Sequence, residues 1–182
     1  GAAPFAEFSA KVLPWMLRGE IQDPFSPVWG SVHALANRLL RFEPDLNPEP
    51  WVIAPHLARF GGTAIATALM ALGVFAGRRA LDAGRRADGI AIVVAFSLAA
   101  SPFTASYHLV LLSLPVALQV ARSRDRAGVL AVLFWAILGS SAIGVLRLAS
   151  GVMAPLAYAR FLGILAISLA VSWTFLTRRA VG

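Results

Sequence analysis

The sequence predicts an all-α, polytopic transmembrane helical protein, and two observations support this fold class. Hydrophobic residues make up 58% of the 182 positions and charged residues only 14%, with a mean hydropathy of +0.73, which lies outside the range of soluble domains. The apolar residues also gather in long runs that are separated by short, arginine-rich segments. Runs of this length favour membrane-spanning helices over strands.

Residues 1–57 contain no run that is long enough to cross a membrane, and they are rich in proline and acidic residues. We therefore expect them to form a structured extracytoplasmic cap on a transmembrane domain, residues 58–182. The sequence GAAPFAEFSAKVLPW at the start does not resemble a signal peptide, so we expect the chain to be an internal or C-terminal part of a larger membrane protein.

Within the cap, we expect an amphipathic helix over residues 27–43. Ser26 followed by Pro27 favours a helix start, and Glu43 followed by Pro44 favours a stop. One face of this helix is apolar, with Val28, Val32, Leu35, Leu39 and Phe42, and the opposite face carries His33, Asn37 and Arg41. Either the polar face points to water from the membrane interface, or it binds an anionic group held between the cap and the membrane helices.

Five membrane crossings are expected, over residues 58–77, 89–101, 106–121, 127–146 and 156–177. Residues 89–120 would measure about 48 Å as one helix, which is too long for a hydrocarbon core of roughly 30 Å. The polar run SPFTASYH, residues 101–108, interrupts this stretch, and we call it the notch. Polar backbone below the membrane surface needs protein or water around it, so we expect a solvated pocket beside Tyr107 and His108.

The arginines predict the orientation in the membrane. Nine basic residues fall in the short segments at one end of the expected crossings, at positions 78, 79, 85, 86, 122, 124, 126, 178 and 179. Loops rich in Lys and Arg face the cytoplasm. The cap, the notch and the connection 147–155 are then expected on the extracytoplasmic side of a plasma membrane.

Composition and motifs exclude several functions. The sequence has no P-loop, dinucleotide-binding fingerprint, HExxH or GxSxG motif, and no cysteine. Its three histidines lack nearby paired acids, so we expect no metal site and no cofactor. The net charge of +7 is explained by membrane topology, so we expect no nucleic acid among the partners.

Three ionisable residues are candidates for chemistry at the outer face. His108 stands where the notch enters the third crossing, so it either transfers a proton or holds a phosphate there, or it only bonds the backbone freed by Pro102. Arg147 and Arg160 flank the outer connection. They either extend to lipid headgroups or join Arg41 in a basic cluster suited to a lipid phosphate.

Two stretches carry a resemblance to a known family: WGSVHALANRLLRFEP in the cap and SPFTASYHLVLLSLPVAL at the notch. Together with the apolar crossing and arginine-rich loop between them, they resemble the C-terminal half of glycosyltransferase family 87, which has a GT-C type of fold. The resemblance covers about residues 10–121. Its most specific part is Ser101, Pro102, Tyr107 and His108, although the family more often has Trp in the aromatic place. An Asn-Gln-Ser common in the family's outer helix appears here only as Gly30-Ser31.

The resemblance implies an integral-membrane hexosyltransferase of the bacterial cell envelope. Such enzymes take a sugar, for example mannose, from a polyprenyl-phosphate donor and pass it to a glycolipid or glycan acceptor on the outer face. Their base is an acid on the first outer loop, which would precede Gly1. On this interpretation His108 and Tyr107 are catalytic, and the substrate is bound by Ser101, His33, Asn37, Arg41, Arg147 and Arg160. The alternative is a membrane transporter or lipid-handling subunit, because carriers also bind substrates where broken helices meet.

Overall fold

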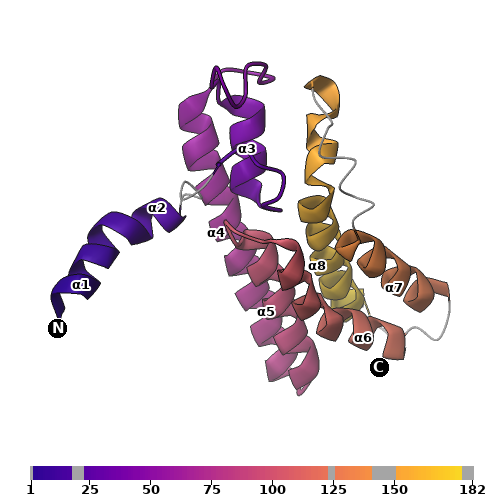
Figure 1. Cartoon of the computed structure of the whole chain (residues 1–182). Helices are drawn as coiled ribbons and strands as arrows, with labels where there is room; N and C mark the ends of the chain where they lie inside the picture. Colours follow the sequence, from indigo (N-terminus) through magenta and orange to yellow (C-terminus); the bar gives the residue numbers. More distant parts are fainter. Residues whose placement is uncertain (1, 18–22, 123–125, 141–150, 178–182) are drawn as a thin grey trace.

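The computed structural model describes residues 2–17, 23–122, 126–140 and 151–177. Over these ranges the chain is all-helical and has no strand, which confirms the all-α prediction. The chain begins with a helical run that extends away from the other helices (Figure 1) and consists of α1 Ala2–Glu7, a π-helical turn η1 Phe8–Val12 and α2 Leu13–Leu17.

A long antiparallel hairpin forms the centre of the molecule. α4, Pro55–Asp82, and α5, Arg86–Ala100, are joined by a turn in which Gly84 has φ +74°. Glycines lie where the two helices touch: a Cβ atom on Gly89 would lie 2.7 Å from Cγ of Leu81 and 2.9 Å from the carbonyl oxygen of Gly77. The backbones therefore approach closely because these positions carry no side chain.

The two helices of the hairpin differ in length, with 28 residues in α4 and 15 in α5. At 1.5 Å per residue α4 is about 42 Å long and α5 about 22 Å, so α5 accompanies only part of α4. The N-terminal part of α4 packs instead against α3, Val32–Leu40 (Figure 1). This contact is close at Gly62, where a Cβ atom would lie 3.4 Å from Cδ2 of His33.

The remaining helices follow the hairpin in the chain. They are the 3-10 helix η2 Ser106–Leu112, α6 Ser113–Arg122, α7 Arg126–Gly139, the 3-10 helix η4 Gly151–Tyr158 and α8 Ala159–Thr177. Ile92 and Phe96 of α5, Leu112 of η2 and Ile164 of α8 form the fully buried centre of this core. α5 is therefore the shared element between the hairpin and the C-terminal helices.

The helix break at the start of the notch is present as predicted. α5 ends at Ala100, and Ser101 has extended backbone angles. The cap docks on this break: the Gly30 N–H donates to the carbonyl oxygen of Thr104 at 2.9 Å, and the Trp29 and Phe103 rings meet edge to face at 5.7 Å. The break is thus covered by protein from the cap.

The amphipathic helix is shorter than the predicted range, residues 27–43. α3 begins after Ser31, whose Oγ accepts the Ala34 N–H at 3.2 Å, and Ser26 lies instead in a turn. At the other end, buried Asn47 donates from Nδ2 to the carbonyl oxygens of Arg38 and Arg41 at 2.9 and 2.6 Å. A capping side chain from farther along the chain therefore ends the helix before Glu43-Pro44 does.

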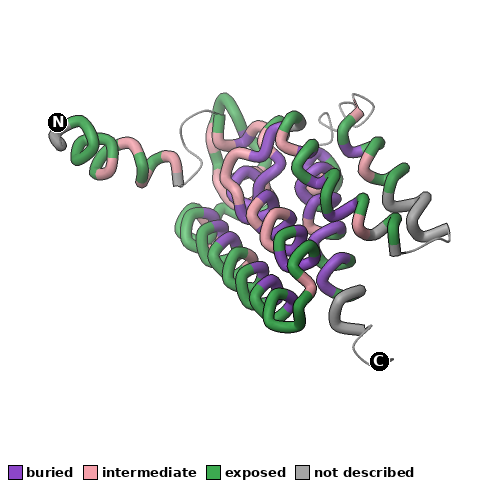
Figure 2. The backbone as a smooth tube through the Cα atoms, turned by 90° about the horizontal axis from the view of Figure 1, so that it is seen from below, coloured by how far each residue is buried: buried purple, intermediate pink, exposed green. Residues whose placement is uncertain are grey.

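Two helical segments among the described residues are long and apolar enough to cross a membrane by length and composition, Pro55–Asp82 and Gly151–Trp173. The other expected crossings correspond to shorter helices, and residues 141–146 of the fourth lie outside the described ranges. One side of α4 is exposed along its length (Figure 2), and that side carries large apolar residues such as Leu57, Phe60 and Phe75. Such a surface suits contact with lipid.

Candidate functional site

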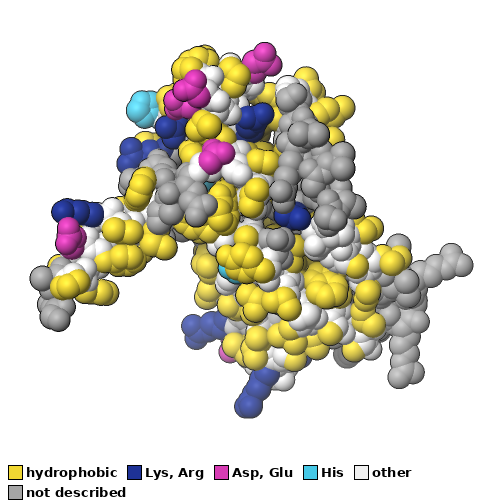
Figure 3. All heavy atoms as spheres, viewed as in Figure 1, with side chains coloured by type: hydrophobic (Ala, Val, Ile, Leu, Met, Phe, Trp, Pro, Cys, Tyr) yellow, Lys and Arg dark blue, Asp and Glu magenta, His cyan; other side chains and the backbone are white. Residues whose placement is uncertain are grey.

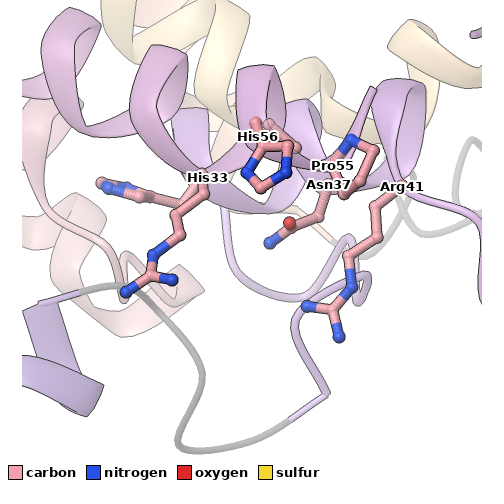
Figure 4. Close-up of a pocket in the computed structure, with 7 residues that line it drawn as sticks. His33, Asn37, Arg41, Pro55 and His56 are labelled. Carbon is pink, nitrogen blue, oxygen red and sulfur yellow. The ribbon is translucent and has the colours of Figure 1, made fainter. Parts of the chain in front are cut away.

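A polar hollow of about 320 Å³ opens between α3 and the first turn of α4 (Figure 4). Its lining consists of His33, Asn37, Arg41, Pro55, His56, Ala58 and Arg59. Two are arginines, two are histidines, and none is acidic. We call this hollow the α3–α4 pocket.

The polar face predicted for the cap helix lines this pocket. His33 and Asn37 are only 5% and 8% exposed, so the alternative in which this face points to water is wrong for them. The reason is tertiary packing: α3 lies against α4 on this side, while Val32 and Ala34 pack in an apolar cluster with Tyr158 and Phe161. The helix is therefore enclosed on both sides.

His33 is the most unusual residue of the pocket. Neither ring nitrogen has a hydrogen-bond partner within the described part of the chain, although the side chain is almost fully buried. Burial lowers the pKa of His33 below its ordinary value of 6.5, because the surroundings solvate an imidazolium poorly. Buried polar groups in folded proteins are normally paired, so this ring points to a ligand or water in the pocket.

The first turn of α4 adds positive potential. Its initial N–H groups have no intrahelical acceptor, and Ala54 before it supplies no side-chain cap. His56 and Arg59 on this turn are exposed at the rim, and Arg59 makes no ion pair with a described residue. Arg41 makes a loose ion pair with Glu43 at 3.7 Å, and its guanidinium lies 5.5 Å from the centroid of the Phe25 ring. The pocket is therefore suited to an anion.

His108 bonds the backbone of the notch. The His108 Nδ1 accepts the backbone N–H of Ala105 at 3.0 Å, and the backbone N–H of His108 donates to the carbonyl oxygen of Ala105. A neutral ring in this bond carries its proton on Nε2, whereas an imidazolium would lose the bond. This contact is with Ala105, whereas the Leu98 carbonyl oxygen that Pro102 leaves free accepts the Thr104 hydroxyl at 2.7 Å, and His108 does not line the α3–α4 pocket.

Tyr107 and Ser101 also lie away from the α3–α4 pocket. Tyr107 is 70% exposed and borders a hollow of about 280 Å³ with Leu109, Val110 and Trp135. This lining is mainly apolar. The described residues therefore do not form the solvated pocket that we expected beside Tyr107 and His108. Ser101 accepts the Phe103 N–H with its Oγ at 3.3 Å and so stabilises the turn.

Arg160 is buried and bonds the end of α7. Its Nε donates to the carbonyl oxygen of Leu138 at 3.3 Å and its Nη2 to that of Ser140 at 3.4 Å. Extension to lipid headgroups is therefore wrong for this residue, and it is not among the residues that line the pocket with Arg41. Arg147, the other predicted phosphate ligand, lies outside the described residues.

Sequence reasoning missed two residues of the α3–α4 pocket, His56 and Arg59. The available signal was Pro55, which fits the first position of a helix and so places His56 and Arg59 in a first turn. No protein-family model matches the sequence, and neither a curated protein nor a solved structure matches it.

Proposed function

We propose that this chain is the lipid-phosphate-binding part of an integral-membrane glycosyltransferase. The enzyme would transfer a hexose from a polyprenyl-phosphate donor to a glycolipid or glycan acceptor at the extracytoplasmic face of a bacterial plasma membrane. The observation that supports this proposal is the α3–α4 pocket, which Arg41, Arg59 and His56 line together with His33, a buried ring that has no hydrogen-bond partner among the described residues.

The chemistry of such a donor fits the pocket. A leaving lipid phosphate needs cations and N–H donors that are already in place, and these act most strongly where water is excluded. Arg59 and the open N-terminus of α4 supply charge, and His33 supplies a ring nitrogen for a phosphate oxygen. A sugar already linked to a lipid phosphate needs no nucleotide-binding domain.

The membrane arrangement is part of the proposal. Five crossings with the cap outside would put the α3–α4 pocket at the outer face, next to a donor that arrives within the membrane. In this arrangement α4 and the η4–α8 segment span fully. The pair formed by α5 and η2–α6 turns back at the notch beneath the cap, which shields the polar backbone from lipid.

Donor binding can be measured on the purified chain in detergent by native mass spectrometry with undecaprenyl phosphate. Arg59→Gln should weaken binding about tenfold, because a hydrogen bond to a charged group contributes roughly 1.5–3 kcal/mol. Arg86→Gln, at the opposite end of the hairpin, is the matched control and should bind normally. Undecaprenol, which lacks the phosphate, should bind wild type and Arg59→Gln equally. Equal phosphate-lipid binding by both variants would contradict the proposal.

A lipid-handling subunit without transferase activity is the second candidate. It is favoured by one observation, namely that no Asp or Glu lines the α3–α4 pocket, so the described residues there supply no carboxylate base. The two candidates differ in turnover. If the full-length parent protein transfers labelled hexose from the donor, and Arg59→Gln reduces that transfer, the enzyme is supported; donor binding without transfer would support the subunit.

A further inference from the structure

A second large hollow lies far along α4 from the α3–α4 pocket. It has a volume of about 520 Å³ and is bordered by α4, α5 and α8 through Leu72, Phe75, Ala76, Arg79, Phe96, Leu169, Ala170, Ser172 and Trp173. We call it the α4–α8 groove. Ala76 and Phe96 are buried at its base, whereas Leu72, Phe75 and Leu169 are exposed along its sides. Its volume is that of a small-molecule site, roughly 300–1,000 Å³.

The lining is apolar except for Arg79 and Ser172. A groove of this kind binds ordered water poorly, because a bound water molecule needs polar partners. Its shape and chemistry match a hydrocarbon chain lying beside the helices. Burial of each methylene group contributes roughly 0.8 kcal/mol, so the binding free energy of a hydrocarbon chain in the groove would increase with the number of methylene groups that it buries.

Arg79 gives the groove a charged end. Its guanidinium lies over the Phe75 ring, 4.7 Å from the centroid, so the side chain is held at the groove. Arg78, Arg85 and Arg86 lie near the same turn, and Figure 3 shows basic side chains at this end of the molecule. The acids there are fewer, and Asp88 is ion-paired with Arg85. This end is therefore electropositive.

We propose that the α4–α8 groove binds one anionic phospholipid, with an acyl chain along the groove and the phosphate at Arg79. An apolar channel with a cation at one end is complementary to an amphiphile with a negative headgroup, and each basic residue near a headgroup contributes about 1 kcal/mol. The inference is independent of the proposed function, because it uses none of the residues of the α3–α4 pocket.

Headgroup recognition is tested by titrating the delipidated chain in detergent with phosphatidylglycerol or phosphatidylcholine and counting bound lipids by native mass spectrometry. Phosphatidylglycerol should bind more tightly, and Arg79→Gln should reduce that preference about fivefold. Arg78→Gln is the matched control, because Arg78 is equally close to the turn but does not line the groove. If both variants lost the preference for phosphatidylglycerol equally, the preference would come from the overall surface charge and not from Arg79, and the proposal would be overturned.

The position of the chain is tested with phosphatidylglycerol that carries a diazirine on its acyl chain. Photolysis should label peptides containing residues 72–79 and 169–173 more than the exposed start of α4 at Leu57 and Phe60. Leu169→Trp, which fills the groove from an exposed position, should lower labelling there at least about threefold. Even labelling along α4 would indicate bulk lipid only, and a Leu169→Cys crosslink between two copies would assign the groove to a dimer; either result overturns the proposal.

These experiments also separate the two proposals. Arg59→Gln should leave phosphatidylglycerol binding unchanged, and Arg79→Gln should leave undecaprenyl phosphate binding unchanged. If a variant loses binding of only one of the two lipids, the substituted residue belongs to the site for that lipid. Loss of both in either single variant would mean that the two hollows are not independent, which contradicts the assignment of a separate lipid to the α4–α8 groove.

Discussion

His33 links the α3–α4 pocket to pH. Its folded-state pKa lies below 6.5 because of burial, so the unfolded chain takes up a proton more readily as the pH falls through 6.5. The folded state therefore loses stability on acidification, and this loss is absent well above pH 6.5. His33→Gln should reduce the fall in Tm between pH 7.5 and pH 5.5, as measured by thermal unfolding in detergent.

Inorganic phosphate provides the control for this effect. An anion in the pocket would favour the protonated ring, so phosphate should reduce the acid-induced fall in Tm of the wild type but not of His33→Gln. His56 and His108 are present in both proteins, so the comparison isolates His33. An unchanged pH dependence in His33→Gln would show that another group causes the acid sensitivity.

His108 tests the difference between a capping and a catalytic histidine. If its Nδ1 mainly accepts the Ala105 N–H, His108→Ala should destabilise the chain by about 1 kcal/mol, and His108→Asn should retain most of that stability through its Oδ1. Thermal unfolding gives the measurement. In the proposed transferase, a proton-transfer role would instead lower turnover by about 10²-fold or more in both variants.

At the residue scale, the sequence predicted the members of the polar face better than their surroundings. The spacing of His33, Asn37 and Arg41 put them together, and the structure places all three along one pocket. The burial of His33 and Asn37 was not predictable, because it depends on packing against α4, which a helical repeat within the cap does not contain. The Nδ1 contact of His108 depends on local backbone angles that Ser101-Pro102 alone does not specify.

Among the elements, the α4–α5 hairpin depends on its glycines. Gly89→Ala should destabilise the chain by about 1–3 kcal/mol, because the new Cβ would meet the Gly77 carbonyl oxygen at 2.9 Å, and backbone cannot move aside as a flexible side chain can. Gly61→Ala is the control: its Cβ would meet only Leu57 at 3.6 Å, so the gain in helix propensity, up to about 1 kcal/mol, should prevail.

Chemical or thermal unfolding in one detergent compares these two glycine variants. Similar destabilisation in both would mean that loss of glycine itself, and not the contact between α4 and α5, determines the effect. The pair is informative because both positions are helical and lie on the same hairpin.

At the element scale, local sequence signals predicted where helices break but not always where they start. α5 ends at Ser101-Pro102, because a proline ring disfavours helical backbone angles at the residue before it. Ser26-Pro27 carried a similar signal for a helix start, yet Ser31 is the N-cap, because Trp29 and Gly30 contact the notch through the Phe103 ring and the Thr104 carbonyl oxygen. A long-range contact therefore overrode a local preference.

For the whole molecule, the orientation predicted from the arginines remains to be measured. A reporter that is active only in the cytoplasm should be active when fused at Gly84, in the turn between α4 and α5, and silent when fused at Gly151. A periplasm-specific reporter at the same two sites should give the opposite pattern. Activity of the cytoplasmic reporter at Gly151 would contradict the arrangement with the cap outside.

The tertiary contacts of the cap also have a consequence for the order of synthesis. The Tyr158 hydroxyl donates to the Phe25 carbonyl oxygen at 2.6 Å across 133 positions of sequence, and the Trp51 indole N–H donates to the Gly151 carbonyl oxygen across 100. At roughly 5–20 residues per second, a ribosome needs about 7–27 s to make the 133 residues between the first pair. For that interval the nascent cap can pack against α4 and the notch but lacks its contacts with residues 151–158.

A chain terminated after Leu138 represents the nascent protein during this interval. It contains the notch but lacks η4 and α8, so its cap should be cut by trypsin at Arg38 and Arg41 faster than the cap of the full chain, in which α3 packs against η4. Equal resistance of the two chains would mean that the contact with Thr104 alone secures the cap. Otherwise the newly made cap, whose Val32 and Ala34 meet Tyr158 and Phe161 only after these residues have been made, is exposed to chaperones and proteases for longer than the other helices.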